Sequence, residues 1–356
     1  MAASRTVATA HVPTVSGLHR DIAEMLGKPT PILTVGELVD IYIRERAVTA
    51  QRPRTQVENR RHLEQHWLPI HEVPAHQINR RVVTACAAAL AKHSGPVAAN
   101  RARAALSAMF AWAVSAGLAD VNPVTGTIKV GIERPRDRVL SDAEVAAIWR
   151  ASGDGDHGQI VRLLLLTGQR RDEVGGMAWT EIDLAKALWS LPATRTKNHR
   201  PHSVPLSAEA LDILAGVTRR RGCPLLFGKG AAAFSGWSRS KNRLDGRIAR
   251  NRVAERLGRP LAKGVKPDDA DALAPWGLHD IRRTAVTGMV ELGVQPHVVE
   301  ALVNHYSGHR AGVAGVYNRA HYSAEKRAAA DLWAAHVTKL VGEAGREVDD
   351  GEGNER

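Results

Sequence analysis

The chain has 356 residues, with 49 Lys or Arg against 37 Asp or Glu, which gives a formal net charge of +12 and a pI near 10.1. Hydrophobic residues make up 44% and charged residues 24%, values that exclude wholesale disorder and fibrous architectures. A chain of this length and basicity is typical of a multidomain protein that binds a polyanion, with nucleic acid as the first candidate. A merely solvated basic surface is the alternative.

The two cysteines, Cys86 and Cys223, have no metal-like spacing, so the sequence excludes a disulfide framework and a cysteine-based zinc site. No apolar segment is long enough to span a bilayer, and the N-terminus has no apolar core typical of a signal peptide. We therefore expect no membrane contact and a reducing, cytoplasmic location. Residues 1–30 lack sustained periodicity and are predicted to form a flexible arm.

Residues 31–121 have the pattern of a small helical domain. Thr34 and Glu37 form a capping-box motif ahead of apolar positions at helical spacing. Further helical patterns cover about 54–68, 79–92 and 97–116. Basic residues on these helices are candidates for contacts with a phosphate backbone, although they could equally form a solvated face: Arg52, Arg54, Arg60, Arg61, Arg101 and Arg103.

Residues 122–138 are rich in Pro, Gly and basic residues and are predicted to be a linker. The domain that follows, 139–340, opens with a second capping-box motif at Ser141 and Glu144. Its pattern is helical apart from two short predicted strands at 187–191 and 202–206, joined by a polar turn. The acidic, glycine-containing residues 341–356 are predicted to be a disordered tail.

Five motifs in the second domain carry side chains suited to phosphate chemistry. Arg170 and Glu173 lie three residues apart, and a guanidinium aimed at a phosphate needs such a carboxylate to orient it. Lys197 lies at the tip of the predicted hairpin. His279 and Arg282 share one face near the start of a helix. The remaining two motifs are His305 in an Asn-His step and Tyr317 in a Val-Tyr-x-Arg context.

In this order, the five motifs resemble those of the tyrosine recombinase (phage integrase) family. The resemblance covers about 34–340. It implies a mainly helical fold with a small antiparallel β-sheet in the catalytic domain, joined to a helical core-binding domain so that the two clamp DNA. Many members carry a separate N-terminal arm-binding domain, whereas here only about 30 unpatterned residues precede the core-binding region. Asn304 also stands where glycine is frequent.

The resemblance implies a role for each motif residue. Arg170 and Arg282 would hold the scissile phosphate, with Glu173 supporting Arg170. Tyr317 would attack phosphorus and form a 3′-phosphotyrosyl intermediate. Lys197 would protonate the leaving 5′-oxygen. His279 would act as base for the tyrosine, and His305 would donate a further hydrogen bond to the phosphate.

Several alternatives remain open from the sequence. Tyr306 and Tyr322 lie close to Tyr317 along the chain, and Arg195, His199 and Arg200 lie near Lys197. Type IB topoisomerases use similar phosphotyrosyl chemistry, and a catalytically silent DNA-binding relic is a non-enzymatic alternative. No carboxylate cluster accompanies the histidines near His305, so we expect no metal and no cofactor.

The resemblance also implies partners. It implies double-stranded DNA with specific recombination sites, a homo-oligomer on DNA in a tetrameric synaptic complex, and accessory DNA-bending proteins. The cellular location would be the cytoplasm of a bacterial host, in association with the nucleoid.

Overall fold

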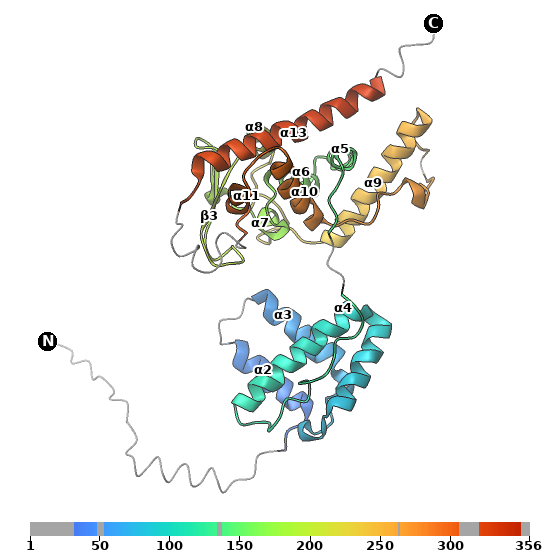
Figure 1. The fold of residues 1–356 in the computed structure, drawn as a ribbon, viewed down its shortest axis with the longest axis vertical. Coiled ribbons are helices and arrows are strands. Elements are labelled where there is room, and N and C mark those ends of the chain that lie inside the picture. Colours follow the sequence, from blue (N-terminus) through green and yellow to red (C-terminus); the bar gives the residue numbers. More distant parts are fainter. Residues whose placement is uncertain (1–31, 48–52, 134–136, 263, 306–319, 350–356) are drawn as a thin grey trace, which may run out of the picture. The chain divides into compact units, whose positions relative to one another are not determined.

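The computed structural model describes residues 32–47, 53–133, 137–262, 264–305 and 320–349. The chain divides into two compact units, Met1–Pro135 and Arg136–Arg356, and each is described by itself (Figure 1). The predicted flexible arm at 1–30 lies outside the described residues. Among the described residues, no helix is both long enough and apolar enough to cross a membrane.

The regular elements of the first unit are all helical over its described residues. Its helices are α2 (Val35–Ala47), α3 (Pro53–Arg61) and α4 (Arg80–Ser115), with short turns η1 (His62–His66), η2 (Leu68–Ile70) and η3 (Ala75–Gln77) between α3 and α4. The predicted capping box is confirmed: Glu37 Oε2 accepts from the Thr34 N–H at 2.8 Å, and Thr34 Oγ1 accepts from the Glu37 N–H at 3.2 Å. The core of this unit is formed by fully buried side chains such as Leu38, Leu63, Trp67, Leu106 and Phe110.

Helix α4 corresponds to two predicted helices. The sequence predicts a break between residues 92 and 97, and the structure has one there, at Gly95 with φ 82° and ψ 161°. Glycine adopts this conformation without a Cβ penalty, and Pro96 cannot donate to the preceding turn. Residues Arg80–Ser115 therefore contain two helices that meet at a kink at Gly95, as the sequence predicts.

Most of the predicted linker packs on α4 instead of forming an unattached connection between the two units. Val124 is 1% exposed, and the Asn122 side chain donates to the Ser107 carbonyl at 3.0 Å. Arg103 Nε donates to Thr127 Oγ1 at 2.7 Å. These contacts attach residues 122–133 to the first unit, because the polar groups of the segment find partners on the helix. The two units separate after Pro135.

The second unit is mainly helical around a small sheet, as the fold-class prediction stated. Strands β1 (Ile182–Asp183), β2 (Leu188–Leu191) and β3 (His202–Pro205) form an antiparallel sheet in the order β1-β2-β3. Trp189 pairs with Ile182 on one side and with Val204 on the other. The helices are α5 (Asp142–Ala151), α6 (Asp156–Thr167), α7 (Arg171–Gly175), α8 (Ala208–Ala215), α9 (Trp237–Leu257), α10 (Leu278–Glu291), α11 (Pro296–Leu302) and α13 (Ser323–Asp349), with 3-10 turns η4 (Trp179–Glu181) and η5 (Asp269–Asp271).

Helix α6 lies in the core of this unit, and α13 packs along α5, α6 and α11 (Figure 1). The run Leu163–Leu166 is buried on every side, because α6 is surrounded by other elements. Trp333 of α13 is 2% exposed, and its indole donates to the Leu165 carbonyl at 2.6 Å. Helix α13 continues to Asp349, so the acidic tail predicted from residue 341 is helical over its first residues.

Candidate active site

Arg170 is fixed by a carboxylate one helical turn away. Helix α6 ends at Gly168, whose φ of 62° reverses the chain, and Arg170 then takes the N-cap position of α7. Glu173 Oε1 accepts from Arg170 Nη1 at 3.0 Å, and Oε2 accepts from the Arg170 N–H at 3.2 Å. Glu173 is 4% exposed. The predicted pairing of Arg170 with Glu173 is therefore present, and the buried carboxylate accepts two hydrogen bonds from Arg170.

Arg282 lies in the second turn of α10 and is buried. Its Nη1 donates to the Gly168 carbonyl at 3.0 Å, and its Nη2 donates to the Val303 carbonyl at 2.5 Å. Burial and the neighbouring charge of Arg170 lower the pKa of Arg282 to about 10. The guanidinium therefore still carries its charge at neutral pH.

The C-terminal end of α11 holds both arginines through consecutive carbonyls. The Val303 carbonyl accepts from Arg282, and the next carbonyl, of Asn304, accepts from Arg170 Nη2 at 3.1 Å. The last carbonyls of a helix have no partner within it, so they are available to side-chain donors. The two guanidinium groups, far apart in sequence, are oriented by adjacent peptide groups.

Two further side chains, which no sequence motif indicated, support this helix end. The Leu302 carbonyl accepts from Gln169 Nε2 at 2.9 Å and lies 2.9 Å from His202 Nε2. Burial lowers the pKa of His202 to about 3, so its ring is neutral and Nε2 carries the donated proton. The available signal was that His202 occupies an inward-facing position of strand β3, where a polar side chain needs a partner.

A cavity of about 550 Å³ brings three predicted residues together. Arg170, Lys197 and His279 all line it, from α7, the β2–β3 loop and the start of α10. Arg171 and Lys241 add two more cationic side chains, and Asp172 is the one carboxylate among the lining residues. A concave site of this charge is suited to binding a phosphate group.

Lys197 lies between two attached residues of its loop. Thr196 is fully buried, and its hydroxyl donates to the Arg200 carbonyl at 2.7 Å. On the other side, the Asn198 side chain is bonded to the Asn304 side chain. Arg195, one of the alternatives to Lys197, pairs with Glu181 and donates to the Glu173 carbonyl at 2.6 Å. Lys197 is exposed on the cavity wall.

His279 and Arg282 do share one helix, as predicted. The His279 side chain is exposed at the cavity, yet partial burial of the ring and the charges of Arg282 and Arg283 lower its pKa below the usual 6.5. The imidazole is therefore neutral at pH 7 and able to accept a proton. His305 is exposed and follows directly on Asn304.

The nucleophile predicted from the resemblance, Tyr317, lies outside the described residues, as does Tyr306. Tyr322 contacts the His297 ring of α11 with centroids 5.1 Å apart. Tyr42 is buried in the first unit, where it packs against Trp112.

Residues 139–323 match the family model described as the Phage integrase family, which is about half of the chain. The chain belongs to the phage integrase family. Prophage integrase IntZ of Escherichia coli (strain K12) is 28% identical over 257 residues, which cover 70% of this chain and 58% of IntZ. Tyrosine recombinase XerC of Mycobacterium tuberculosis (strain ATCC 25177 / H37Ra) is 28% identical over 225 residues, which cover 58% of this chain and 68% of XerC.

Solved integrase structures share the fold. A lambda integrase dimer bound to a COC′ core site matches with a TM-score of 0.56 at 18% identity, covering 86% of each chain. The Tn1549 transposon integrase in complex with a circular intermediate DNA matches with a TM-score of 0.56 at 16% identity, covering 77% of this chain and 92% of that one. The chain spans little more than half the length of IntZ and 36% of the length of the prophage integrase IntA. The prediction of the family and of its fold class is confirmed.

The basic residues of the first unit differ in what they contact. Arg60, Arg61 and Arg101 are exposed and form surface ion pairs with Glu64, Glu58 and Glu133, which contribute little stability. Arg103 is instead half-buried and holds Thr127 through two hydrogen bonds. Arg52 and the side chain of Arg54 lie outside the described residues.

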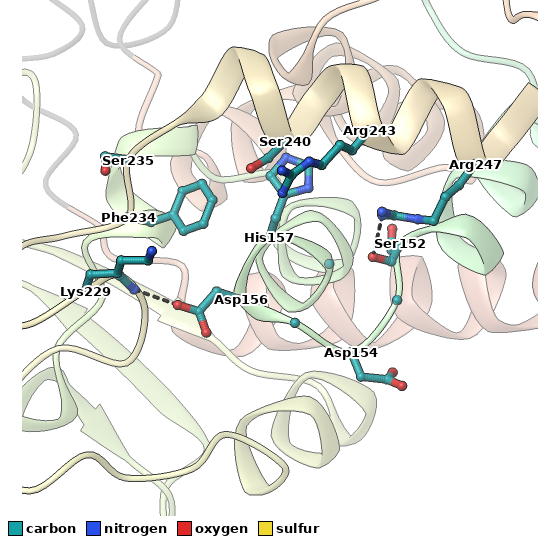
Figure 2. A pocket seen from close by; sticks show the side chains of 14 residues that line it. Ser152, Asp154, Asp156, His157, Lys229, Phe234, Ser235, Ser240, Arg243 and Arg247 are labelled. Atoms are coloured by element: carbon teal, nitrogen blue, oxygen red, sulfur yellow. Dashed lines mark hydrogen bonds between the residues drawn. The ribbon is translucent and has the colours of Figure 1, made fainter. Parts of the chain in front are cut away.

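A second cavity of about 540 Å³ lies between the start of α6 and the first half of α9, and it contains no predicted site residue (Figure 2). Arg247 donates to the Ala151 and Ser152 carbonyls at 2.6 and 3.0 Å, and Asp156 accepts from the Gly228 N–H at 2.7 Å. Burial lowers the pKa of His157 to about 4, so its ring is neutral at pH 7. These bonds join the segment between α5 and α6 to α9, and the start of α6 to Gly228.

Proposed function

We propose that the protein is a site-specific DNA recombinase or integrase that cuts and rejoins DNA through a covalent 3′-phosphotyrosyl intermediate. The observation that carries the proposal is the arrangement of Arg170 and Arg282 on adjacent carbonyls at the end of α11. Lys197 and His279 line the same cavity as Arg170. Family membership supports the same reaction.

The two arginines would neutralise the charge that gathers on the non-bridging oxygens of the scissile phosphate. The Tyr317 hydroxyl would attack phosphorus and give its proton to His279, which is neutral at pH 7. The bond from phosphorus to the 5′-oxygen would break as Lys197 donates a proton to that oxygen. His305 would donate a further hydrogen bond to the phosphate. The phosphotyrosyl link preserves the energy of the broken bond, so rejoining needs no nucleotide cofactor.

The proposed partner is double-stranded DNA with specific recombination sites, held between the helical core-binding domain and the catalytic domain in the manner of a clamp. The structures similar to this chain include a lambda integrase dimer on a core site and a lambda integrase tetramer bound to a Holliday junction. By analogy, the protein would act as a tetrameric synaptic complex in the bacterial cytoplasm, associated with the nucleoid. Accessory DNA-bending proteins would assist assembly.

The test of this proposal is Tyr317→Phe, which removes only the attacking hydroxyl. We expect near wild-type DNA affinity and no covalent protein–DNA adduct on a denaturing gel with labelled DNA. Sequencing of the trapped ends from the wild-type protein would identify the target site. A persistent adduct in the variant would move the nucleophile to Tyr306 or Tyr322. Relaxed topoisomers without joined recombinants would favour the topoisomerase alternative, and bound but uncut DNA would favour a relic.

A further inference from the structure

We propose that Asn198 and Asn304 form an amide pair that positions Lys197 next to the phosphate-binding arginines. The inference rests on the proposed function, because it concerns the placement of the proposed general acid. In this role both asparagines are positioning residues, since they act through Lys197 and Arg170.

The pair is reciprocal and joins segments 106 residues apart. Asn198 Nδ2 donates to Asn304 Oδ1 at 2.7 Å, and Asn304 Nδ2 donates to Asn198 Oδ1 at 3.3 Å. Asn304 is 5% exposed, so the loss of its partner would leave buried amide groups unsatisfied. The β2–β3 loop is thus attached at its tip to the end of α11.

The backbone conformation of Asn304 favours asparagine or glycine at this position. Its φ is 51°, in the left-handed region that glycine adopts freely and asparagine tolerates better than most residues. Glycine would satisfy the backbone but would offer no amide to the loop. Asparagine meets both requirements, and its carbonyl meanwhile accepts from Arg170 Nη2.

One residue therefore connects the proposed acid to the phosphate-binding groups. Asn304 holds Arg170 through its carbonyl and Asn198 through its side chain, and Asn198 is the neighbour of Lys197. The lysine side chain has a flexible stem, so the placement of its ammonium depends on where its backbone is fixed. Thr196 attaches one side of Lys197, and the amide pair attaches the other.

The consequence is a selective defect in leaving-group protonation. In Asn198→Ala the arginines keep their partners at Glu173 and at the α11 carbonyls, while the loop loses its attachment. A misplacement of about 1 Å can cost roughly a hundredfold in rate. We expect cleavage to slow by about ten- to a hundredfold, with little change in the DNA concentration that gives half-maximal rate.

The experiment compares two substrates in single-turnover cleavage by the full chain. One substrate is normal DNA, and in the other the bridging 5′-oxygen is replaced by sulfur, which leaves as a stable thiolate without a proton. Asn198→Ala and Asn304→Gly should be slow on the first and near the wild-type rate on the second, as should Lys197→Ala. The double variant Asn198→Ala/Asn304→Gly should be no slower than the slower single variant, because both remove the same contact. Asn251→Ala, exposed on α9, is the matched control.

The outcomes separate the inference from the proposed function. Absence of any adduct from the wild-type protein would refute the proposed function. A wild-type rate of Asn198→Ala on normal DNA would overturn the inference alone. Equal slowness of Asn198→Ala on both substrates, with an unchanged melting temperature, would also overturn it, because the defect would then lie in phosphate binding instead of proton donation.

Discussion

Glu173 binds Arg170 twice, through the guanidinium at 3.0 Å and through the backbone N–H at 3.2 Å, while it is itself 4% exposed. The carboxylate therefore fixes the start of α7 and the direction of the side chain together. Because Arg170 lines the basic cavity, the same contact sets where a bound phosphate would lie. We therefore expect a change at Glu173 to affect both the stability of the fold and the proposed cleavage.

We expect Glu173→Ala to lower the free energy of unfolding by about 3 kcal/mol, the magnitude typical of breaking a buried ion pair. Glu173→Gln keeps one acceptor and loses the second, since the amide nitrogen cannot accept. It should therefore be less destabilised than Glu173→Ala but still slow in cleavage. Urea unfolding and adduct formation measure the two effects. Full cleavage by Glu173→Ala would contradict the supporting role.

The local patterns of the sequence were sufficient for much of the fold. The capping boxes at Thr34 and Ser141 form as predicted, because each depends on residues within one turn. The hairpin was predictable from two alternating apolar runs. Strand β1, with two residues, is too short to show alternation. The arginine-binding carbonyls of α11 and the Asn198–Asn304 pair were not predictable, because backbone acceptors have no residue type and long-range pairing has no local pattern.

DNA affinity should depend steeply on salt, with a log–log slope of about −0.9 per phosphate contact. Arg101 is exposed, with a side chain 67% accessible, whereas Arg103 is bound to Thr127. We expect Arg101→Gln to reduce the slope by about 1. The matched variant Arg103→Gln should leave the slope unchanged and lower the melting temperature of the first unit. A slope near zero for the wild-type protein would refute the clamp. An unchanged slope in Arg101→Gln together with a reduced slope in Arg103→Gln would show that Arg103, and not Arg101, contacts phosphate.

The acid limit of cleavage should lie below pH 6.5. The pKa of His279 is lowered, so the ring stays neutral at pH 7 and gains its proton only at pH values under its ordinary pKa. A base is lost on protonation, so the rate should fall as the pH drops through that lowered value. Rates at limiting DNA report the free enzyme and are the relevant measurement. An acid limb above pH 6.5, or one that survives in His279→Gln, would assign the base elsewhere.

Strand cleavage should be undiminished by excess chelator. Within the described ranges, no group of three or more His, Cys, Asp or Glu side chains could hold a metal ion. The proposed charge stabilisation comes from Arg170 and Arg282 instead. Adduct formation with and without chelator measures this directly. Loss of cleavage that magnesium restores would indicate a metal-dependent mechanism.

The packing of α13 on α10 should be sensitive to a single methyl group. A Cβ at Gly288 would lie 2.4 Å from Cζ3 of Trp333, whose ring is 2% exposed and bonded through its indole to the Leu165 carbonyl. The ring cannot shift without breaking that bond, so Gly288→Ala should cost about 1–3 kcal/mol of stability, as overpacked cores do. For a unit of this size each kcal/mol lowers the melting temperature by about 2–4 °C.

Val290→Ala, on the exposed face of the same helix, is the control and should change the melting temperature far less. Equal melting temperatures for Gly288→Ala and the wild-type protein would show that α13 does not hold Trp333 against α10 in solution.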